Sequence, residues 1–172
     1  PDQEYVARTL PQVVADAAAA HGQRMAITDG EVRLTYAELD AARRRASRAF
    51  IAAGLEKGER IAIWAPNIYQ WIIAAIGAQS VGGVLVPLNT RYKGAEAGYI
   101  LRASGARMLF TVGDFLGVRY PELLADQSLP SIERTVLLTG SASGCQSWDA
   151  FLAAGEAVPE AQVASRAATL TP

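Results

Sequence analysis

The sequence has little of several residue types that functional sites often use. Its 172 residues include one cysteine, Cys145, and one histidine, His21. A disulfide within the chain is therefore excluded, and so is a metal site built from several cysteines. Because the two residues lie far apart in the sequence, they are a poor basis for a Cys/His catalytic pair.

An excess of charge of either sign is also absent. The net charge is -1, with 16 Lys and Arg against 17 Asp and Glu, so no overall field would attract nucleic acid or an anionic membrane. The one local excess is Arg43–Arg45 together with Arg48, which we interpret as the solvated face of a helix. No basic segment followed by an apolar run opens the sequence, so no signal peptide is predicted. We expect a cytoplasmic protein.

The longest segment without a charged side chain runs from Ile61 to Thr90 and permits two interpretations. A membrane-spanning helix needs about 20 uninterrupted apolar residues, whereas Pro66-Asn67 and Gly82-Gly83 interrupt this run. The segments RIAIWA and VLVPL near its ends are rich in residues typical of strands. We therefore interpret the run as a buried strand–helix–strand unit of a parallel sheet, with no membrane span.

Within this unit the pattern predicts a helix that begins after Asn67. The Asn67 side chain can cap the helix, with Gln70 three residues later. Gly83 and its neighbour Gly82 would allow a tight turn into the second strand, which Pro87 would end. The predicted inner side of the helix consists of Ile68, Trp71, Ile72, Ala75, Ile76 and Gln79.

Further helices and strands precede this unit. A helix is predicted between Thr9 and Gly22. A β-hairpin follows, and its turn is expected at Asp29-Gly30, a strong two-residue hairpin signal. A second helix then begins with a capping box formed by Thr35 and Glu38.

The second half of the chain continues the alternation. The elements predicted there are a helix over 93–105, a strand over 107–112, a helix over 115–127 with a break near Pro121, a strand over 133–139 and a helix over 147–155 capped by Ser147. Residues 156–172 are rich in alanine and predict either a linker or a helix that needs neighbours the chain does not supply. The alternation predicts an α/β fold with a doubly wound, mainly parallel sheet, preceded by a helix and a β-hairpin.

The usual phosphate-binding and catalytic motifs are missing. No G-x-G-x-x-G follows a strand, no G-x-x-x-x-G-K-[ST] occurs, and no nucleophile elbow or carboxylate pair stands out. Thr139–Ser147 follows a strand and has small residues whose amides could cradle a phosphate, but no Lys or Arg accompanies it. We interpret it as a flexible surface loop. The residues alone therefore predict no catalytic residue and no metal ligand.

Three segments, in this order and spacing, resemble the N-terminal part of the adenylate-forming acyl-CoA synthetases. They are LTYAEL (Leu34–Leu39), GLEKGERIAIWAPN (Gly54–Asn67) and GAQSVGGVLVPLNTRY (Gly77–Tyr92). The last is closer to the fatty-acyl-CoA ligase branch than to peptide-synthetase adenylation domains, which usually have Asp at the position of Asn89. The resemblance implies the first part of the family's large N-terminal domain. Residues 1–155 would be its α/β subdomain, and 156–172 a linker toward a phosphate-binding loop that this chain lacks.

The resemblance also implies an activity. It implies part of an ATP-dependent carboxylic acid:CoA ligase, with ATP, Mg²⁺ and CoA as cofactors and a fatty or related acid as substrate. Because the family's catalytic residues lie outside this chain, we expect the chain alone to be inactive, to bind no cofactor and to self-associate, with exchange of residues 156–172 as one route. Arg91 is the one site residue implied, since a guanidinium suits a CoA phosphate, with an ion pair or a solvated side chain as the alternative. The rival function is a free-standing flavodoxin-like binding or interaction module without catalysis.

Overall fold

A five-stranded parallel sheet is the centre of the structure, a computed structural model that describes residues 7–172. Its strands lie in the order β4-β3-β5-β6-β7. From β3 the chain adds one strand on one side and three on the other, which is the order of doubly wound, flavodoxin-like sheets. The predicted α/β fold is confirmed. The strands are β3 (Arg60–Trp64), β4 (Val84–Pro87), β5 (Met108–Val112), β6 (Arg134–Thr139) and β7 (Gln146–Ser147).

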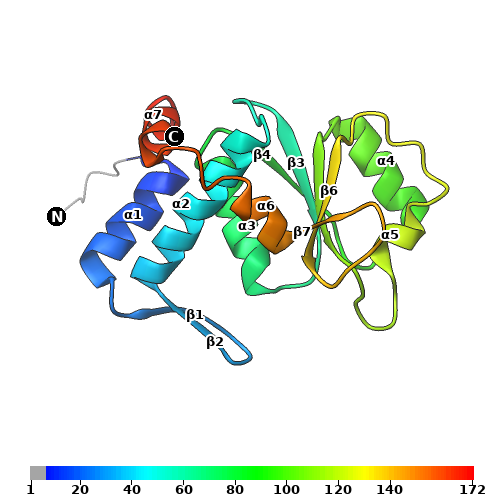
Figure 1. The fold of residues 1–172 in the computed structure, drawn as a ribbon, viewed down its shortest axis with the longest axis horizontal. Coiled ribbons are helices and arrows are strands. Elements are labelled where there is room, and N and C mark those ends of the chain that lie inside the picture. The colour runs from blue at the N-terminus through cyan, green and yellow to red at the C-terminus, as the bar shows by residue number, and fades with distance from the viewer. Residues whose placement is uncertain (1–6) are drawn as a thin grey trace.

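Helices cover both faces of this sheet (Figure 1). One face carries α2 (Tyr36–Ala52), α3 (Tyr69–Gln79) and α6 (Trp148–Ala153), and the other carries α4 (Gly94–Ser104) and the short α5 (Tyr120–Leu123). Outside α2 lie α1 (Leu10–His21) and α7 (Glu160–Ala168), and the antiparallel hairpin of β1 (Met25–Asp29) and β2 (Val32–Thr35) extends beside α2 and α3. Among these helices, none has the length and hydropathy of a membrane span.

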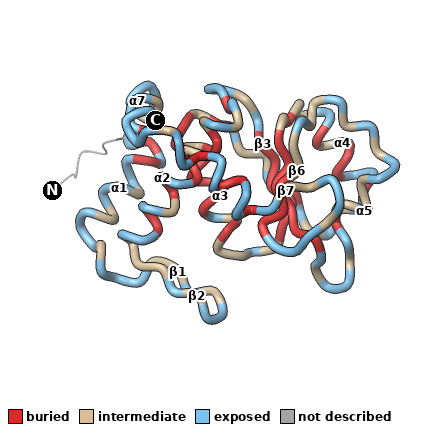
Figure 2. The backbone as a smooth tube through the Cα atoms, viewed as in Figure 1, coloured by how far each residue is buried: buried red, intermediate tan, exposed pale blue. Residues whose placement is uncertain are grey.

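The charge-free segment forms a strand–helix–strand unit of the parallel sheet, as the sequence predicts, but its second strand, β4, is the edge strand and is only partly buried. Its first strand, β3, pairs with β4 on one side and β5 on the other, and residues 61–64 have 0% exposed surface (Figure 2). An unpaired charge in such a place would lose its hydration without compensation. The absence of charge from residues 61–64 of β3 therefore follows from their burial between two helical layers.

The helix inside this segment begins later than predicted. Its first residue is Tyr69, with Ile68 at the N-cap position and no side-chain cap from the flanking residues. The carboxylate of Asp29, at the end of β1, accepts a hydrogen bond from the backbone N–H of Tyr69 at 2.9 Å. The cap is therefore supplied by the hairpin, and the prediction that Asn67 caps the helix is wrong.

The inner face of α3 is also rotated from the predicted one. Ala75 and Ile76 are buried as predicted, but Ile72 is 39% exposed. Small residues face α2 instead: a Cβ on Gly77 would lie 2.6 Å from the Cβ of Ala46. Close approach of two helices through small residues buries more backbone than the larger side chains would allow, so packing overrides the apolar pattern. The residues buried in α3 are Gln70, Ile73, Ala74, Ala75, Ile76, Gly77 and Ala78.

Two turns differ from the sequence prediction. Asp29 pairs with Val32, so the hairpin turns at Gly30-Glu31, one residue later than predicted. The helix predicted over 115–127 is reduced to α5, because Phe115 and Val118 pair across a tight turn. Pro121, in the first turn of α5, cannot donate a backbone hydrogen bond to an earlier turn, and it disfavours helical backbone at the residue before it.

The arginine cluster of α2 is only partly solvated, which corrects the prediction of an exposed face. Arg43 is 5% exposed, and its guanidinium donates to Asp40 at 2.8 Å and to Ser80 at 3.2 Å. Burial of a cation in this way requires such a paired carboxylate. The other arginines of the cluster contact residues 156–160. Their contacts are Arg44 with Glu160, Arg45 with Glu156 and Arg48 with the carbonyl of Val158.

Residues 160–168, left open by the sequence between a linker and a helix, form α7. Its buried residue is Val163, and Arg166 donates to Glu56 at 3.0 Å. The neighbours that the helix needs therefore lie within this chain, on α1, α2 and the α2–β3 loop. The division of the chain at residue 155 stays a prediction.

Burial of β3 makes the first testable prediction. Ile63→Asp should leave the chain unfolded, because an unpaired buried carboxylate costs several kcal/mol, against a total stability of about 5–15 kcal/mol. Ile72→Asp is the matched control, because Ile72 belongs to the same charge-free segment but is partly exposed. It should cost less than about 1 kcal/mol in urea unfolding followed by circular dichroism. Cooperative unfolding of Ile63→Asp at the wild-type midpoint would contradict the buried strand.

The cap of α3 makes the second prediction. Asp29→Ala should lower the free energy of unfolding by about 1 kcal/mol, the usual cost of removing a helix cap. Asn67→Ala should cost less than about 0.5 kcal/mol, as for a surface substitution. Urea denaturation of both variants gives the comparison. A larger loss for Asn67→Ala would restore the cap that the sequence predicts.

Candidate functional site

The loops after the parallel strands gather at one edge of the sheet. In doubly wound sheets ligands bind outside the carboxyl ends of the strands, where the chain leaves neighbouring strands toward opposite faces. Here α3 follows β3 on one face and α5 follows β5 on the other. The candidate site therefore comprises the loops 65–68, 88–93 and 113–119.

Two buried aromatic residues connect these loops. Trp64, the last residue of β3, donates from its indole Nε1 to the carbonyl of Asn89 at 3.0 Å. Tyr120, at the start of α5, donates from its hydroxyl to the carbonyl of Thr90 at 3.0 Å. The two rings pack edge to face with centroids 4.7 Å apart, a favourable aromatic geometry. Burial raises the pKa of the Tyr120 hydroxyl above its usual value, so the group keeps its proton and remains a donor.

The loop after β4 carries Arg91, the residue that the resemblance implies. The side chain of Asn89 accepts from the backbone N–H of Arg91 at 2.9 Å, and the carbonyl of Asn89 accepts from that of Tyr92 at 3.1 Å. Arg91 itself is exposed, and its guanidinium forms no ion pair or hydrogen bond with any residue from 7 to 172. Hydrogen bonds of its backbone thus order the loop, while the guanidinium of Arg91 stays available to a ligand.

A shallow cavity of about 330 Å³ lies beside this loop. Asn67 and Trp71 line it from the β3 side, and they also line a second cavity of about 400 Å³ under the hairpin. The sequence predicted Trp71 to be core, but its position shortly after a strand end was a signal that it could face the functional edge. The lining residues of the first cavity are Ala65, Asn67, Trp71, Pro87, Leu88, Asn89 and Thr90.

The glycine-rich loop after β6 lacks a cation, as its sequence indicates. Ser141, Ser143 and Gly144 are exposed. Gly140 lies close to the backbone of Gly113, where a Cβ would come within 3.3 Å of the Gly113 Cα. Burial raises the pKa of the Cys145 thiol, which disfavours the reactive thiolate. The loop therefore offers amides to an anion without a partner charge.

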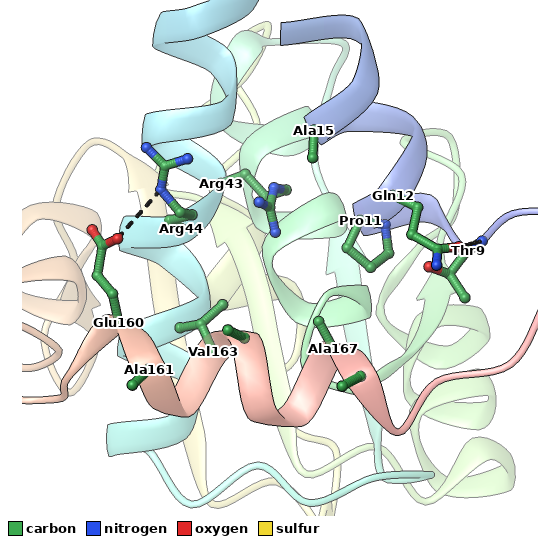
Figure 3. A pocket seen from close by; sticks show the side chains of 12 residues that line it. Thr9, Pro11, Gln12, Ala15, Arg43, Arg44, Glu160, Ala161, Val163 and Ala167 are labelled. Atoms are coloured by element: carbon green, nitrogen blue, oxygen red, sulfur yellow. Dashed lines mark hydrogen bonds and ion pairs between the residues drawn. The ribbon is translucent and has the colours of Figure 1, made fainter. Parts of the chain in front are cut away.

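A cavity of about 530 Å³, larger than the two at the carboxyl edge and under the hairpin, lies on the other side of α2 from the sheet, between α1, α2 and α7 (Figure 3). Alanines of α7 and Pro11 of α1 give it an apolar lining, with Arg43 and Arg44 beside them. Within residues 7–172, the Thr9 hydroxyl and the Arg44 Nε are buried there without a hydrogen-bond partner. Both atoms are closed off from solvent, so neither presents a hydrogen-bonding group to the space of the cavity.

The described part of the chain contains no candidate metal site. Across residues 7–172 no cluster of His, Cys, Asp or Glu is suited to hold a metal ion. At the carboxyl edge the exposed guanidinium of Arg91 can bind an anion, and the other charged residues of the three loops are Lys93, Asp114 and Arg119.

Comparison with known proteins gives the family. The AMP-binding enzyme family matches residues 14–169. This chain is a member of that family. It is 36% identical over 170 residues to 3-[(3aS,4S,7aS)-7a-methyl-1,5-dioxo-octahydro-1H-inden-4-yl]propanoyl:CoA ligase of Rhodococcus jostii (strain RHA1). It is also 36% identical over 165 residues to the protein of the same name from Mycobacterium tuberculosis (strain ATCC 25618 / H37Rv).

The chain spans about one third of the length of these relatives. The two alignments cover 95% and 96% of this chain but 33% and 32% of the relatives. The resemblance to acyl-CoA synthetases predicted from Leu34 to Tyr92 is confirmed.

Solved structures agree on the fold of this AMP-binding family member. The N-terminal domain of FACL13 from Mycobacterium tuberculosis has a TM-score of 0.73 at 21% identity, over 90% of this chain and 37% of that one. The anthranilate CoA ligase AuaEII, in complex with anthranoyl-AMP, has a TM-score of 0.76 at 20% identity, over 87% of this chain and 29% of that one. At such identities the likeness establishes the fold.

Proposed function

We propose that this chain is the N-terminal α/β part of an ATP-dependent carboxylic acid:CoA ligase. The observation that carries the proposal is the family match over residues 14–169, together with two acid:CoA ligases aligned over nearly the whole chain. In this reaction the acid is first joined to AMP with release of pyrophosphate, and the CoA thiol then replaces AMP. The substrate class is a fatty or related carboxylic acid.

ATP and Mg²⁺ do not fit the residues described here. The Gly140–Gly144 loop has no cation to pair with a triphosphate, and residues 7–172 contain no metal-binding cluster. A bound triphosphate loses hydration, and this loss must be compensated by cationic partners or a metal ion. We therefore assign ATP and Mg²⁺ binding to the two thirds of the protein that the relatives carry in addition, and the chain alone is inactive.

CoA does fit the carboxyl edge, through Arg91, so for CoA this proposal departs from the expectation that the chain alone binds no cofactor. Its guanidinium is exposed and unpaired within residues 7–172, on a loop whose backbone is anchored by hydrogen bonds. Planar guanidinium groups bind phosphate oxygens with two parallel hydrogen bonds. Arg91 would hold and orient a CoA phosphate, while CoA supplies the thiol that forms the product.

Three further expectations remain proposals. The division into an α/β subdomain, 1–155, and a segment leading to a phosphate loop, 156–172, follows from the family resemblance. Self-association of the chain draws support from partly exposed apolar side chains of α1, Leu10 and Val13. A cytoplasmic location agrees with the use of ATP and CoA.

A chimeric ligase tests the proposed function. Residues 14–169 would replace the matching third of the Rhodococcus jostii relative. Given ATP, Mg²⁺, CoA and the acid in that relative's name, the chimera should release AMP and pyrophosphate and form a thioester. Arg91→Ala should raise the KM for CoA about tenfold, as expected for loss of a charge-assisted hydrogen bond, and leave pyrophosphate release unchanged.

Arg24→Ala is the control, because Arg24 is also exposed but lies in the α1–β1 loop. It should leave the KM for CoA unchanged. A chimera that unfolds cooperatively but releases ADP and phosphate, or no pyrophosphate at all, would overturn the proposal. An unchanged KM for CoA in Arg91→Ala would overturn the role of Arg91 alone.

A further inference from the structure

We propose that Trp64 and Tyr120 are positioning residues for Arg91, fixing the loop that presents its guanidinium to CoA. The inference rests on the proposed role of Arg91, but its structural half can be tested without any ligand. It concerns three segments distant in sequence: the end of β3, the loop after β4 and the start of α5.

The two aromatic side chains bind consecutive carbonyls. Trp64 donates to the carbonyl of Asn89 and Tyr120 to that of Thr90, each at 3.0 Å. These are the two residues immediately before Arg91 in the sequence. Two adjacent peptide groups are thus held from the interior, which fixes the direction in which the next residue leaves the loop.

Both donors are themselves immobilised. Trp64 has 0% and Tyr120 2% exposed surface, and the two rings pack against each other. The carbonyl of Trp64 also accepts from the hydroxyl of Thr111 on β5, at 2.6 Å. Trp64 therefore belongs to the sheet and Tyr120, on α5, is packed against it, and supports of this kind define the geometry of a binding residue more closely than loop contacts do.

The loop adds its own hydrogen bonds to this arrangement. The carbonyl of Asn89 accepts from Trp64 and from the backbone N–H of Tyr92, which uses both of its lone pairs. The N–H of Arg91 is bonded to the Asn89 side chain. The amides of Arg91 and Tyr92 therefore report directly on whether the anchors hold.

If their role were purely structural, Trp64 and Tyr120 would only fill space in the core and would not position Arg91. The Tyr120 hydroxyl distinguishes the two roles, because Tyr120→Phe removes one oxygen atom and leaves the ring against Trp64. Tyr99→Phe is the matched control, since Tyr99 is 67% exposed on α4.

The experiment uses the 172-residue chain and NMR. In Tyr120→Phe, hydrogen exchange at the amides of Arg91 and Tyr92 should accelerate about tenfold, as for the loss of one hydrogen bond. Titration with CoA follows the Arg91 Nε–Hε resonance, with Arg24 as the internal reference. Because one phosphate contact is weak, the titration extends to millimolar CoA. The shift of Arg91 should saturate at several-fold higher CoA in Tyr120→Phe than in the wild type or Tyr99→Phe.

The outcomes separate the two claims. Unchanged exchange at Arg91 and Tyr92 in Tyr120→Phe would overturn the anchoring. Faster exchange with unaltered CoA response would overturn the positioning role. If Arg91 responds no more than Arg24 in the wild type, the CoA contact of the proposed function fails, and with it the positioning role, while the exchange data still decide whether the loop is anchored.

Discussion

Burial of β3 on both faces is the constraint on which the remaining structure depends. Its residues 61–64 have 0% exposed surface and pair with strands on both sides. No charge is tolerated there, and the helices on either face must pack closely to exclude water. The close contact of Gly77 with Ala46 between α3 and α2 meets this requirement on one face. The absence of charge from residues 61–64 and the close packing of the helices on β3 thus follow from the burial of one strand.

The same strand connects the core to the functional edge. Trp64 ends β3 inside the core, yet its indole N–H reaches the loop that carries Arg91. A buried indole needs a hydrogen-bond partner, and here that partner is a backbone carbonyl of the loop. One hydrogen bond therefore both satisfies the buried indole N–H and orders the loop. The position of the candidate site therefore follows from the packing of the sheet.

The sequence predicts the elements well where local signals are strong. The capping box of Thr35 and Glu38 is present, with the Glu38 carboxylate accepting from the Thr35 N–H at 2.8 Å. That hydrogen bond holds the pKa of Glu38 below its usual value. Ser147 likewise caps α6. Arg91 is proposed through family resemblance, since an exposed arginine carries no local signal of its own.

Several of the missed features depend on contacts between distant residues. The cap of α3 comes from Asp29, 40 positions away, so the nearer Asn67 was the natural choice from sequence. Arg43 can be buried because Asp40 and Ser80 accept hydrogen bonds from its guanidinium. The segment that leads into α7 and the start of α7 contact arginines of α2 through Glu156 and Glu160. The hydrogen bonds of Trp64 and Tyr120 to loop carbonyls have no sequence signature, because any residue supplies a carbonyl.

The central claim is that the carboxyl edge organised by β3 is the functional face of this AMP-binding family member. A crystal structure of the chain grown with millimolar CoA tests it most directly. The account predicts a CoA phosphate within hydrogen-bond distance of the Arg91 guanidinium, with the carbonyls of Asn89 and Thr90 still bound to Trp64 and Tyr120. CoA bound at the Gly140–Gly144 loop, or in the cavity between α1 and α7, would contradict it.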